Sequence, residues 1–317
     1  MNKKNKRSAL RRELMTKDQI AMVRRRKLAE GTWKLFRFLI LFGLCFVIVY
    51  PLLFMISCAF RERIDMNDPT VMWIPRNFTL DVIRETADAM ELGRTVFNTL
   101  VINIGCSLLQ VITTAITGYG FARFSFKGKK FFFGIVILMI LVPPQIILLP
   151  QYDQFKLLGL LNTPWTMYLP AMTANGLKAG IMIFIFRQFF RGLPRELEDA
   201  AYLDGCGPFR TFVSIMIPNA ASSFLTVFLF SVVWYWNDYY VCNSFFSTNR
   251  TLALMIKNIQ AVLNASLFND ASLRVSTREY VVWTQAACLI SISPMLVMYA
   301  FLQKHFTEGI ERSGIVG

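Results

Sequence analysis

The sequence has few of the residues on which metal sites and catalytic motifs depend. A single histidine among 317 residues excludes a histidine-rich metal site. The six cysteines form no Cys-x-x-Cys pair and most lie in apolar runs, which indicates neither a zinc site nor a disulfide framework. Neither a Gly-x-x-x-x-Gly-Lys-Ser/Thr segment nor a His-Glu-x-x-His segment occurs. The chain therefore has no ATP-binding phosphate loop and no zinc-protease motif of its own.

Charged residues are also scarce, at 17% of the chain, whereas a soluble domain has about a quarter. Hydrophobic residues make up 55%, and the mean hydropathy is +0.44. The apolar residues occur in long blocks, which is typical of a membrane protein. The net charge of +14 would favour a nucleic-acid partner only on a soluble basic face. Because the cations cluster beside apolar blocks, they indicate orientation in the membrane, and no nucleic-acid partner is expected.

Six apolar segments reach the length of about 20 residues that crosses the hydrocarbon of a bilayer. They are residues 38–60, 95–122, 131–149, 170–190, 220–243 and 280–302. We therefore expect an all-α integral membrane protein with six transmembrane helices. A basic arm, residues 1–33, precedes the transmembrane domain, residues 34–317. The arm and the first apolar segment are too long for a signal peptide.

The charges of the loops predict the topology. The basic arm and the loop 123–130, which has four cations and no acid, should be cytoplasmic. The loop 61–94 mixes both signs and suits the outside. The loop 191–219 has both arginines and acids, so its cytoplasmic placement follows from its neighbours. An even number of spans then puts both termini in the cytoplasm of a multi-pass cell-membrane protein.

The loop 191–219 shows the start and stop signals of two short helices. Pro194 suits the first turn of a helix, and the acids that follow suit its positive end. Gly205 can end that helix in the left-handed conformation, Pro208 can start a second one, and Pro218 can break it before the fifth span. On physical grounds alone, an ordinary structured loop explains the pattern about as well.

The same loop resembles the cytoplasmic signature of the permease subunits of ABC importers. That signature reads Glu-Ala-Ala, three residues, Gly, nine residues, Ile, one residue, Leu-Pro. This sequence keeps the spacing throughout, with Asp in place of the Glu and Ile217 in place of the Leu. The residues that the resemblance assigns to ATPase coupling are Glu198, Asp199, Ala200, Ala201, Asp204, Gly205, Ile215 and Pro218.

Other segments resemble the carbohydrate branch of this family, specifically maltose-type permeases. They are residues 119–130, residues 150–163, the Trp-Asn-acid element 236–238 and the glycine-spaced tail 309–317. The family usually has a lysine before the final glycine, where this chain has Val316, so a contact by that lysine is not expected. The likeness covers roughly residues 34–317 and leaves out the basic arm.

The resemblance implies a type I importer permease, the membrane-channel subunit for a sugar or oligosaccharide. Its loop helix would dock in a cleft of a cytoplasmic ATPase, whose closure switches the channel between inward- and outward-facing states. The implied partners are a second homologous permease, two ATP-binding subunits, an extracytoplasmic solute-binding protein and the lipid bilayer. The partner ATPase would use ATP and Mg²⁺, whereas this chain is expected to bind no cofactor and to catalyse no reaction.

Two other classes of membrane protein are alternatives to an importer permease. An enzyme working inside the membrane would need a metal motif or paired acids within its spans, and neither is present in the sequence. A secondary carrier or channel not driven by ATP would usually show repeated halves or ionisable residues in mid-span. We expect neither feature here.

Polar and aromatic side chains in the second and fifth spans are candidates for the substrate pathway. The candidates are Asn103, Trp234, Trp236, Asn237 and Asp238. Flat aromatic faces can pack on sugar rings, although an aromatic belt at the membrane interface explains the cluster as well. The partner permease could also hold most of the sugar. The loop 244–280 is long for a connector and is expected to face outward and contact the binding protein.

Overall fold

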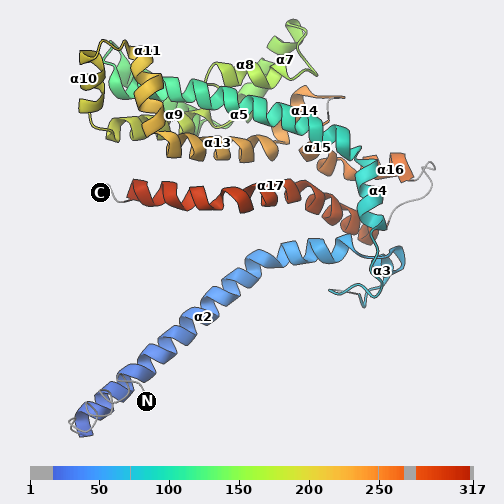
Figure 1. Ribbon diagram of the computed structural model, residues 1–317. Helices are drawn as coiled ribbons and strands as arrows, with labels where there is room; N and C mark the ends of the chain where they lie inside the picture. Colours follow the sequence, from blue (N-terminus) through green and yellow to red (C-terminus); the bar gives the residue numbers. More distant parts are fainter. Residues whose placement is uncertain (1–16, 72, 249, 268–275, 315–317) are drawn as a thin grey trace. The chain divides into compact units, whose positions relative to one another are not determined.

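The computed structural model of the chain describes residues 17–71, 73–248, 250–267 and 276–314 (Figure 1). The described residues form helices joined by turns, with one isolated bridge between Arg61 and Phe78 and no strand. Contacts divide the chain into two units between Ile56 and Ser57, and each unit is described by itself.

The first unit is made mainly by helix α2 (Lys17–Ala59), which continues from the basic arm into the first apolar segment. Its 43 residues give a length of roughly 65 Å, about twice the thickness of the bilayer hydrocarbon. The apolar side chains along it are exposed, as Phe42 illustrates at 61%. An apolar surface of this extent needs lipid or another protein to cover it.

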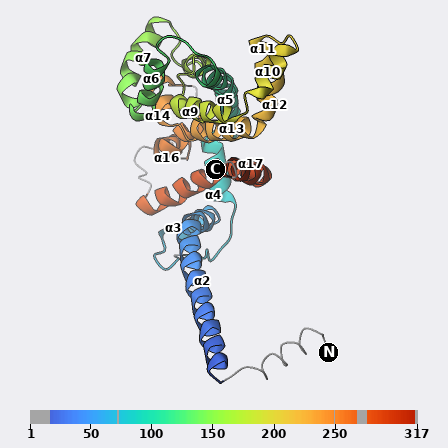
Figure 2. The same cartoon turned by 90° about the vertical axis from the view of Figure 1, so that its left-hand side faces the viewer.

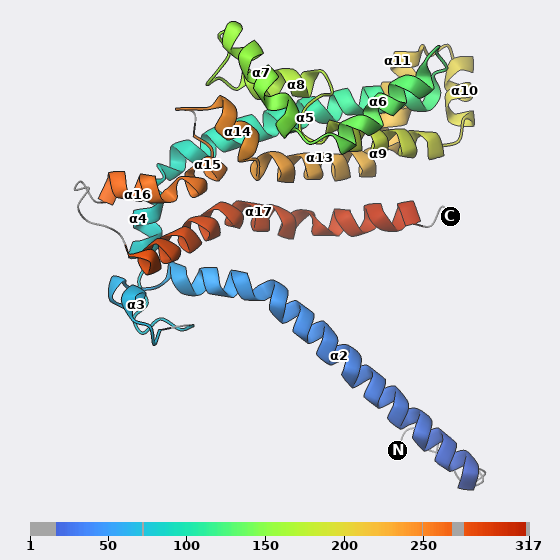
Figure 3. The same cartoon turned by 180° about the vertical axis from the view of Figure 1, so that it is seen from behind.

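Helix α5 (Leu92–Arg123) is the centre of the second unit. Helices α8 (Trp165–Met172), α9 (Ala179–Gly192) and α13 (Ala221–Trp236) pack along it (Figures 1 and 3). Gly118 lets α5 and α9 approach closely, because a Cβ there would lie 2.6 Å from the Cβ of Phe186. Small residues at helix contacts are typical of packing inside membranes.

Several segments expected as single spans are interrupted. Helices α6 (Lys129–Leu141) and α7 (Gln145–Leu157) meet at a bend of 100°, because Pro143 and Pro144 cannot continue the hydrogen bonds of α6. Residues 173–178 separate α8 from α9, with positive φ at Ala174 and Lys178. The segment 220–243 likewise divides into α13 and α14 (Tyr240–Phe245).

Three described helices are long and apolar enough to cross a membrane alone: α2, α5 and α17. Counting each strongly bent pair as one span raises the number to five. The described part of the protein is therefore helical and membrane-embedded, with three to five candidate spans by length and composition.

Short helices gather at one end of α5, and α17 leads away from them. They are α3 (Arg63–Asn67), α4 (Asp81–Ala89), α15 (Leu252–Lys257) and α16 (Ile259–Leu267). Helix α17 (Thr277–Gly314) packs on α3 and α4 near its start and on α13 further along. It runs toward the opposite end of the unit (Figures 1 and 3).

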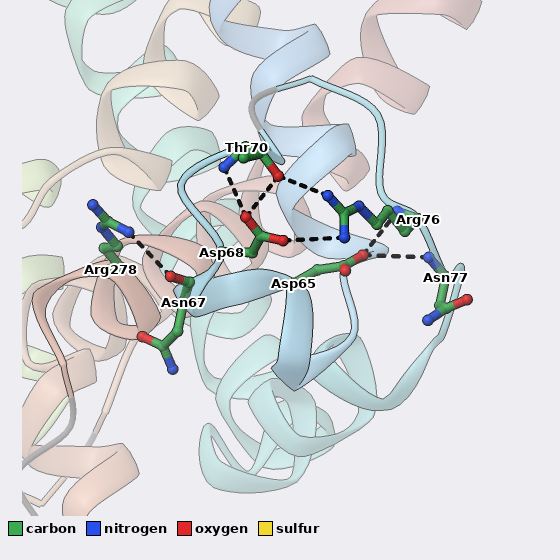
Figure 4. A network of polar contacts seen from close by, with 7 residues as sticks. All are labelled: Asp65, Asn67, Asp68, Thr70, Arg76, Asn77 and Arg278. Atoms are coloured by element: carbon green, nitrogen blue, oxygen red, sulfur yellow. Dashed lines mark hydrogen bonds and ion pairs between the residues drawn. The ribbon is translucent and has the colours of Figure 1, made fainter.

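Polar contacts join the loop after α3 to the first turn of α17 (Figure 4). Arg278 donates a hydrogen bond of 3.0 Å to the carbonyl of Asn67. Asp68 accepts hydrogen bonds from the hydroxyl and the backbone N–H of Thr70 and forms an ion pair of 3.2 Å with Arg76. Hydrogen bonds from Thr70, aided by the Arg76 charge, hold the pKa of Asp68 below its ordinary value.

Candidate functional site

The loop 191–219 folds at the end of α5 opposite to α4 (Figures 1 and 2). It forms α10 (Glu196–Leu203), α11 (Pro208–Thr211), the π-helical turn η1 (Phe212–Met216) and α12 (Ile217–Asn219). The two helices indicated by the sequence are thus present, with two differences in detail. Helix α10 begins after Arg195, so Pro194 precedes it. The chain bends by 81° after Asn219, while Pro218 lies inside the first turn of α12, where its missing N–H costs nothing.

Gly205 ends α10 with φ at +80°, the left-handed conformation that the sequence indicated. The N–H of Cys206 donates to the carbonyl of Ala201 at 2.9 Å, and the N–H of Gly205 donates to that of Tyr202 at 3.0 Å. This pair of bonds is a Schellman motif, which satisfies the last carbonyls of a helix and favours glycine. The end of α10 is therefore fixed by its own backbone.

A buried polar cluster attaches α10 to the end of α5. The carboxylate of Glu198 accepts a hydrogen bond of 2.7 Å from the hydroxyl of Tyr119 and forms an ion pair of 3.0 Å with Nε of Arg123. Arg123 also donates to the carbonyl of Leu193 at 2.7 Å. The side chains of Arg123 and Glu198 are only 6% and 8% exposed. We call Tyr119, Arg123 and Glu198 the α5–α10 clamp.

Aromatic rings surround the clamp. Tyr119 packs on Phe124, Phe190 and Phe212, with ring centroids 4.8 to 5.5 Å apart. Phe190 belongs to α9 and Phe212 to η1, so the ring of Tyr119 joins three elements. A dry surrounding strengthens the electrostatic contacts of the clamp and makes the loss of one partner costly.

The residues of the signature divide between a buried and an exposed face. Glu198 and Ala201 are buried, and Ile215 is half-buried. The exposed members are Asp199, Ala200, Asp204, Gly205 and Pro218. Leu203 and Phe209 lie in the same loop and are 88% and 77% exposed, which is unusual for large apolar side chains. The loop thus has a partly apolar exposed surface, and the α5–α10 clamp fixes its buried face.

Sequence reasoning did not find the roles of Tyr119 and Arg123, which were noted only as part of a resemblance. The spacing of these two residues in the sequence indicates that they share a polar contact. Residues four apart share a helix face, and here a hydroxyl and a cation lie in the last turns of an apolar span. Such groups need polar partners, and the acidic loop that follows α9 supplies Glu198.

Two neighbouring cavities lie between the interrupted helices of the second unit. The larger, of about 550 Å³, lies between the α6–α7 bend, the α8–α9 break and Tyr235 of α13. Its polar lining residues include Gln145, Gln151, Asn175 and Lys178. The smaller, of about 540 Å³, shares Gln145 and Leu148 with the first and adds Tyr152, Tyr239, Tyr240, Asn243 and Ser244. The larger cavity is lined mainly by apolar residues with a few amides among them, and the smaller one by tyrosines, amides and apolar residues.

A hydrogen-bond network fixes the α8–α9 break beside the larger cavity. Tyr235 donates through its hydroxyl to Oε1 of Gln110 and accepts the N–H of Leu177 at 3.2 Å. The side-chain amide of Gln110 donates to the carbonyl of Leu177. A Cβ on Gly176 would collide with Gln110 Oε1 and the Tyr235 hydroxyl. Gln110 of the second span thus faces other helices, as a polar residue in a membrane should.

The structure gives Asn103 and Trp236 contacts between helices. Asn103 is buried and donates to the carbonyl of Val232 at 2.9 Å, which joins α5 to α13. Trp236 is also buried and donates from its indole to the carbonyl of Ser291 at 3.1 Å, which joins α13 to α17.

The other three pathway candidates also have local contacts. Trp234 stacks on Phe230 at 5.6 Å between ring centroids. Asn237 donates to Val233 O at 2.8 Å, and Asp238 accepts the N–H groups at the start of α14. None of the five candidates lines either of these two cavities. Their role in the pathway stays a prediction.

Lys178 corrects one expectation from the sequence. No ionisable residue was expected in mid-span, but Lys178 lies inside the fourth apolar segment and lines the larger cavity. Because α8 and α9 are separated at this point, Lys178 lies at a cavity in which a few polar residues stand among apolar ones.

The membrane helices and the loop attached to them agree with what is found in known proteins. These proteins are inner-membrane components of transport systems. Residues 95–312 match the model of a family described as binding-protein-dependent transport system inner membrane component. The chain belongs to this family, and the resemblance stated from the sequence is confirmed. A carrier that is not driven by ATP is not favoured.

Individual relatives extend over nearly the whole chain. The arabinooligosaccharides transport system permease protein of Halalkalibacterium halodurans is 29% identical over 277 residues, which are 86% of this chain and 93% of the relative. The maltodextrin transport system permease protein of Bacillus subtilis is 27% identical over 286 residues, 90% of this chain and 96% of the relative. A solved bacterial ABC transporter that imports the acidic polysaccharide alginate contains a chain with the same fold, at a TM-score of 0.70 and 17% identity. The likeness covers 88% of this chain and 98% of that one.

Proposed function

We propose that the chain is the membrane-channel subunit of an ATP-driven, binding-protein-dependent importer of a sugar or oligosaccharide. The observation that carries the proposal is α10, whose buried face is fixed to α5 while its opposite face is exposed. Membership of the family supports the transport role, and the sugars in the names of the relatives support a carbohydrate. The tyrosine surfaces of the smaller cavity suit sugar rings.

The loop would couple the channel to a separate ATPase. The exposed side chains of Ala200, Leu203 and Phe209 would enter a cleft of that subunit, and the clamp would pass its movement to α5. Rigid-body movement of packed helices between two states is a common way to switch access to a site. ATP and Mg²⁺ would be bound by two ATPase subunits, and a second permease would complete the channel.

The proposed topology has six spans. They are α2, α5, the bent pair α6–α7, the interrupted pair α8–α9, α13 with the helical stretch Pro208–Asn219 that bends into it, and α17. The end of α17 lies at the same end of the second unit as α10, which supports a cytoplasmic C-terminus (Figures 1 and 3). The basic residues before the first span support a cytoplasmic N-terminus. Reporter fusions at the two termini test this arrangement, and an outward-facing C-terminus would contradict six spans.

The outward face would receive the binding protein. A third cavity of about 430 Å³ lies between the residues after α14 and helices α15 and α16, and Glu91 and Arg250 line it. It belongs to the loop 244–280 that the sequence marked as a contact for the binding protein. Residues 249 and 268–275 of that loop lie outside the described residues.

The test is ATPase activity of the complex in nanodiscs, formed from this chain, its partner permease and its ATPase subunits. Addition of binding protein loaded with oligosaccharide should stimulate ATP hydrolysis, whereas unloaded binding protein should stimulate it less. Failure of the ATPase to co-purify with this chain would contradict the proposal. Uptake that requires an ion gradient and no ATP would favour a secondary carrier instead.

A further inference from the structure

Lys178 is the only basic residue among those that line the larger cavity, and no aspartate or glutamate lines it. The salt bridges of the described residues do not include Lys178. Its side chain is exposed, so its ammonium group is available to a molecule in the cavity. The cavity therefore has one positive charge and no counter-charge of its own among the described residues.

Lys178 lies far from the end of the span, at a depth where a charged residue is unusual. Gln110 contacts Leu177, the residue before Lys178, and lies 13 residues before the end of α5 at Arg123. At the rise of an α-helix this places Lys178 roughly 20 Å from that end, well inside the span. A charged residue at such depth is expensive, and those present usually serve a substrate or ion pathway.

Most of the other lining residues are apolar, and a few polar residues lie among them, as is usual for a ligand site. Gln145, Gln151 and Asn175, which have side-chain amides, are among the residues that line the same cavity. Amides both donate and accept hydrogen bonds, as sugar hydroxyls do. A lysine adds a partner for an anion, and an ammonium–carboxylate contact is stronger than a contact between neutral groups.

We propose that this cavity binds an oligosaccharide that carries a carboxylate, with Lys178 as the counter-ion of that carboxylate. The inference rests on the proposed function and specifies its substrate as a uronic-acid oligosaccharide. The position of Lys178 directly before α9 adds to the effect, because the N-terminal end of a helix favours a negative charge.

Binding should be measured on the purified transporter without its binding protein, because the binding protein imposes a selectivity of its own. The probes are oligogalacturonate and oligomannuronate, each paired with its methyl ester, and a neutral maltodextrin. One acidic probe should bind the wild type more tightly than its ester and than maltodextrin. Lys178→Gln should weaken that acidic probe about tenfold to a hundredfold, as for the loss of a charged hydrogen bond, and leave the ester unchanged.

Two further variants separate the charge from the fold. Lys178→Arg should retain most of the affinity, because it keeps the charge. Lys156→Gln should have no effect, since Lys156 is exposed at the end of α7 and lines neither the larger nor the smaller cavity. Equal losses for acid and ester in Lys178→Gln would show a structural role and overturn the inference.

Other results distinguish this inference from the proposed function. Binding of maltodextrin with no binding of either acidic probe would overturn the carboxylate site and leave the sugar importer standing. Co-purified lipid that is lost from Lys178→Gln, with no difference between acid and ester, would assign the lysine to a lipid phosphate and overturn the inference. Absence of ATP-driven uptake for every sugar tested would instead refute the proposed function.

Discussion

Replacement of Glu198 by alanine tests whether the α5–α10 clamp transmits movement. The change removes the acceptor of the Tyr119 hydroxyl and leaves Arg123 with the carbonyl of Leu193 as its remaining contact. Both charged side chains are less than a tenth exposed. Breaking a buried pair by removing one partner costs about 3–5 kcal/mol, because the other charge stays buried without compensation.

That cost should act on the attachment of α10 more than on the whole fold, because α5 keeps its packing against α8, α9 and α13. A loss of about 3 kcal/mol corresponds to a shift of more than a hundredfold in the equilibrium between attached and detached α10. We expect Glu198→Ala to reach the membrane and to keep basal ATPase activity. Stimulation by the loaded binding protein should fall at least tenfold.

Glu196→Ala is the matched control, because Glu196 is an exposed acid in the same helix. Its stimulated ATPase activity should stay within a factor of two of the wild type, since an exposed charge is worth little. The double variant Arg123→Met, Glu198→Ala should be less impaired than Glu198→Ala alone, because it removes the uncompensated charge. Normal stimulation in Glu198→Ala, or equal losses in Glu198→Ala and Glu196→Ala, would refute the clamp as a coupling element.

Three further changes probe the backbone, the packing and the outer network. Gly205→Val places a β-branched residue at positive φ, at a cost of about 1–2 kcal/mol or more, so stimulated ATPase activity should fall while membrane abundance is kept. Gly118→Val should overpack the contact between α5 and α9, which destabilises the protein by about 1–3 kcal/mol and lowers the melting temperature in detergent. Gly120→Val should leave the melting temperature unchanged, because there is open space around Gly120. Asp68→Asn should destabilise the protein at neutral pH. Because Thr70 lowers the pKa of Asp68 in the folded protein, the wild type should stay more stable than Asp68→Asn as the pH falls to 3.8. This difference in stability should disappear only below the lowered pKa.

Hydropathy and turn residues predicted much of the fold. The spans near α5 and α17 follow directly from apolar length, and the two helices of the loop 191–219 follow from Pro208 and Gly205. These features are local, so composition and spacing are sufficient to find them. The match between the loop and the family signature then gave the class of transporter, which the family comparison confirmed.

The interruptions of the spans were not predicted. The α6–α7 bend follows from the adjacent Pro143 and Pro144, but the α8–α9 break depends on contacts between distant residues. The α8–α9 break is stabilised by Gln110 and Tyr235, which lie 125 residues apart in the sequence. The pair formed by Arg123 and Glu198 likewise joins separate elements. A hydropathy average over neighbouring residues contains no information about such distant partners. It also hides a single charged residue, so Lys178 was assigned to an apolar segment.

Sugar uptake into proteoliposomes tests the central claim most directly. The complex of this chain with its partner permease and ATPase is reconstituted with ATP and Mg²⁺ on the side of the ATPase and loaded binding protein on the other. Labelled oligosaccharide should cross to the ATPase side in the presence of ATP, and it should not cross with a non-hydrolysable ATP analogue or when Glu198→Ala replaces the wild type. Equal uptake with and without ATP hydrolysis would contradict the assignment of this chain as the channel of an ATP-driven importer.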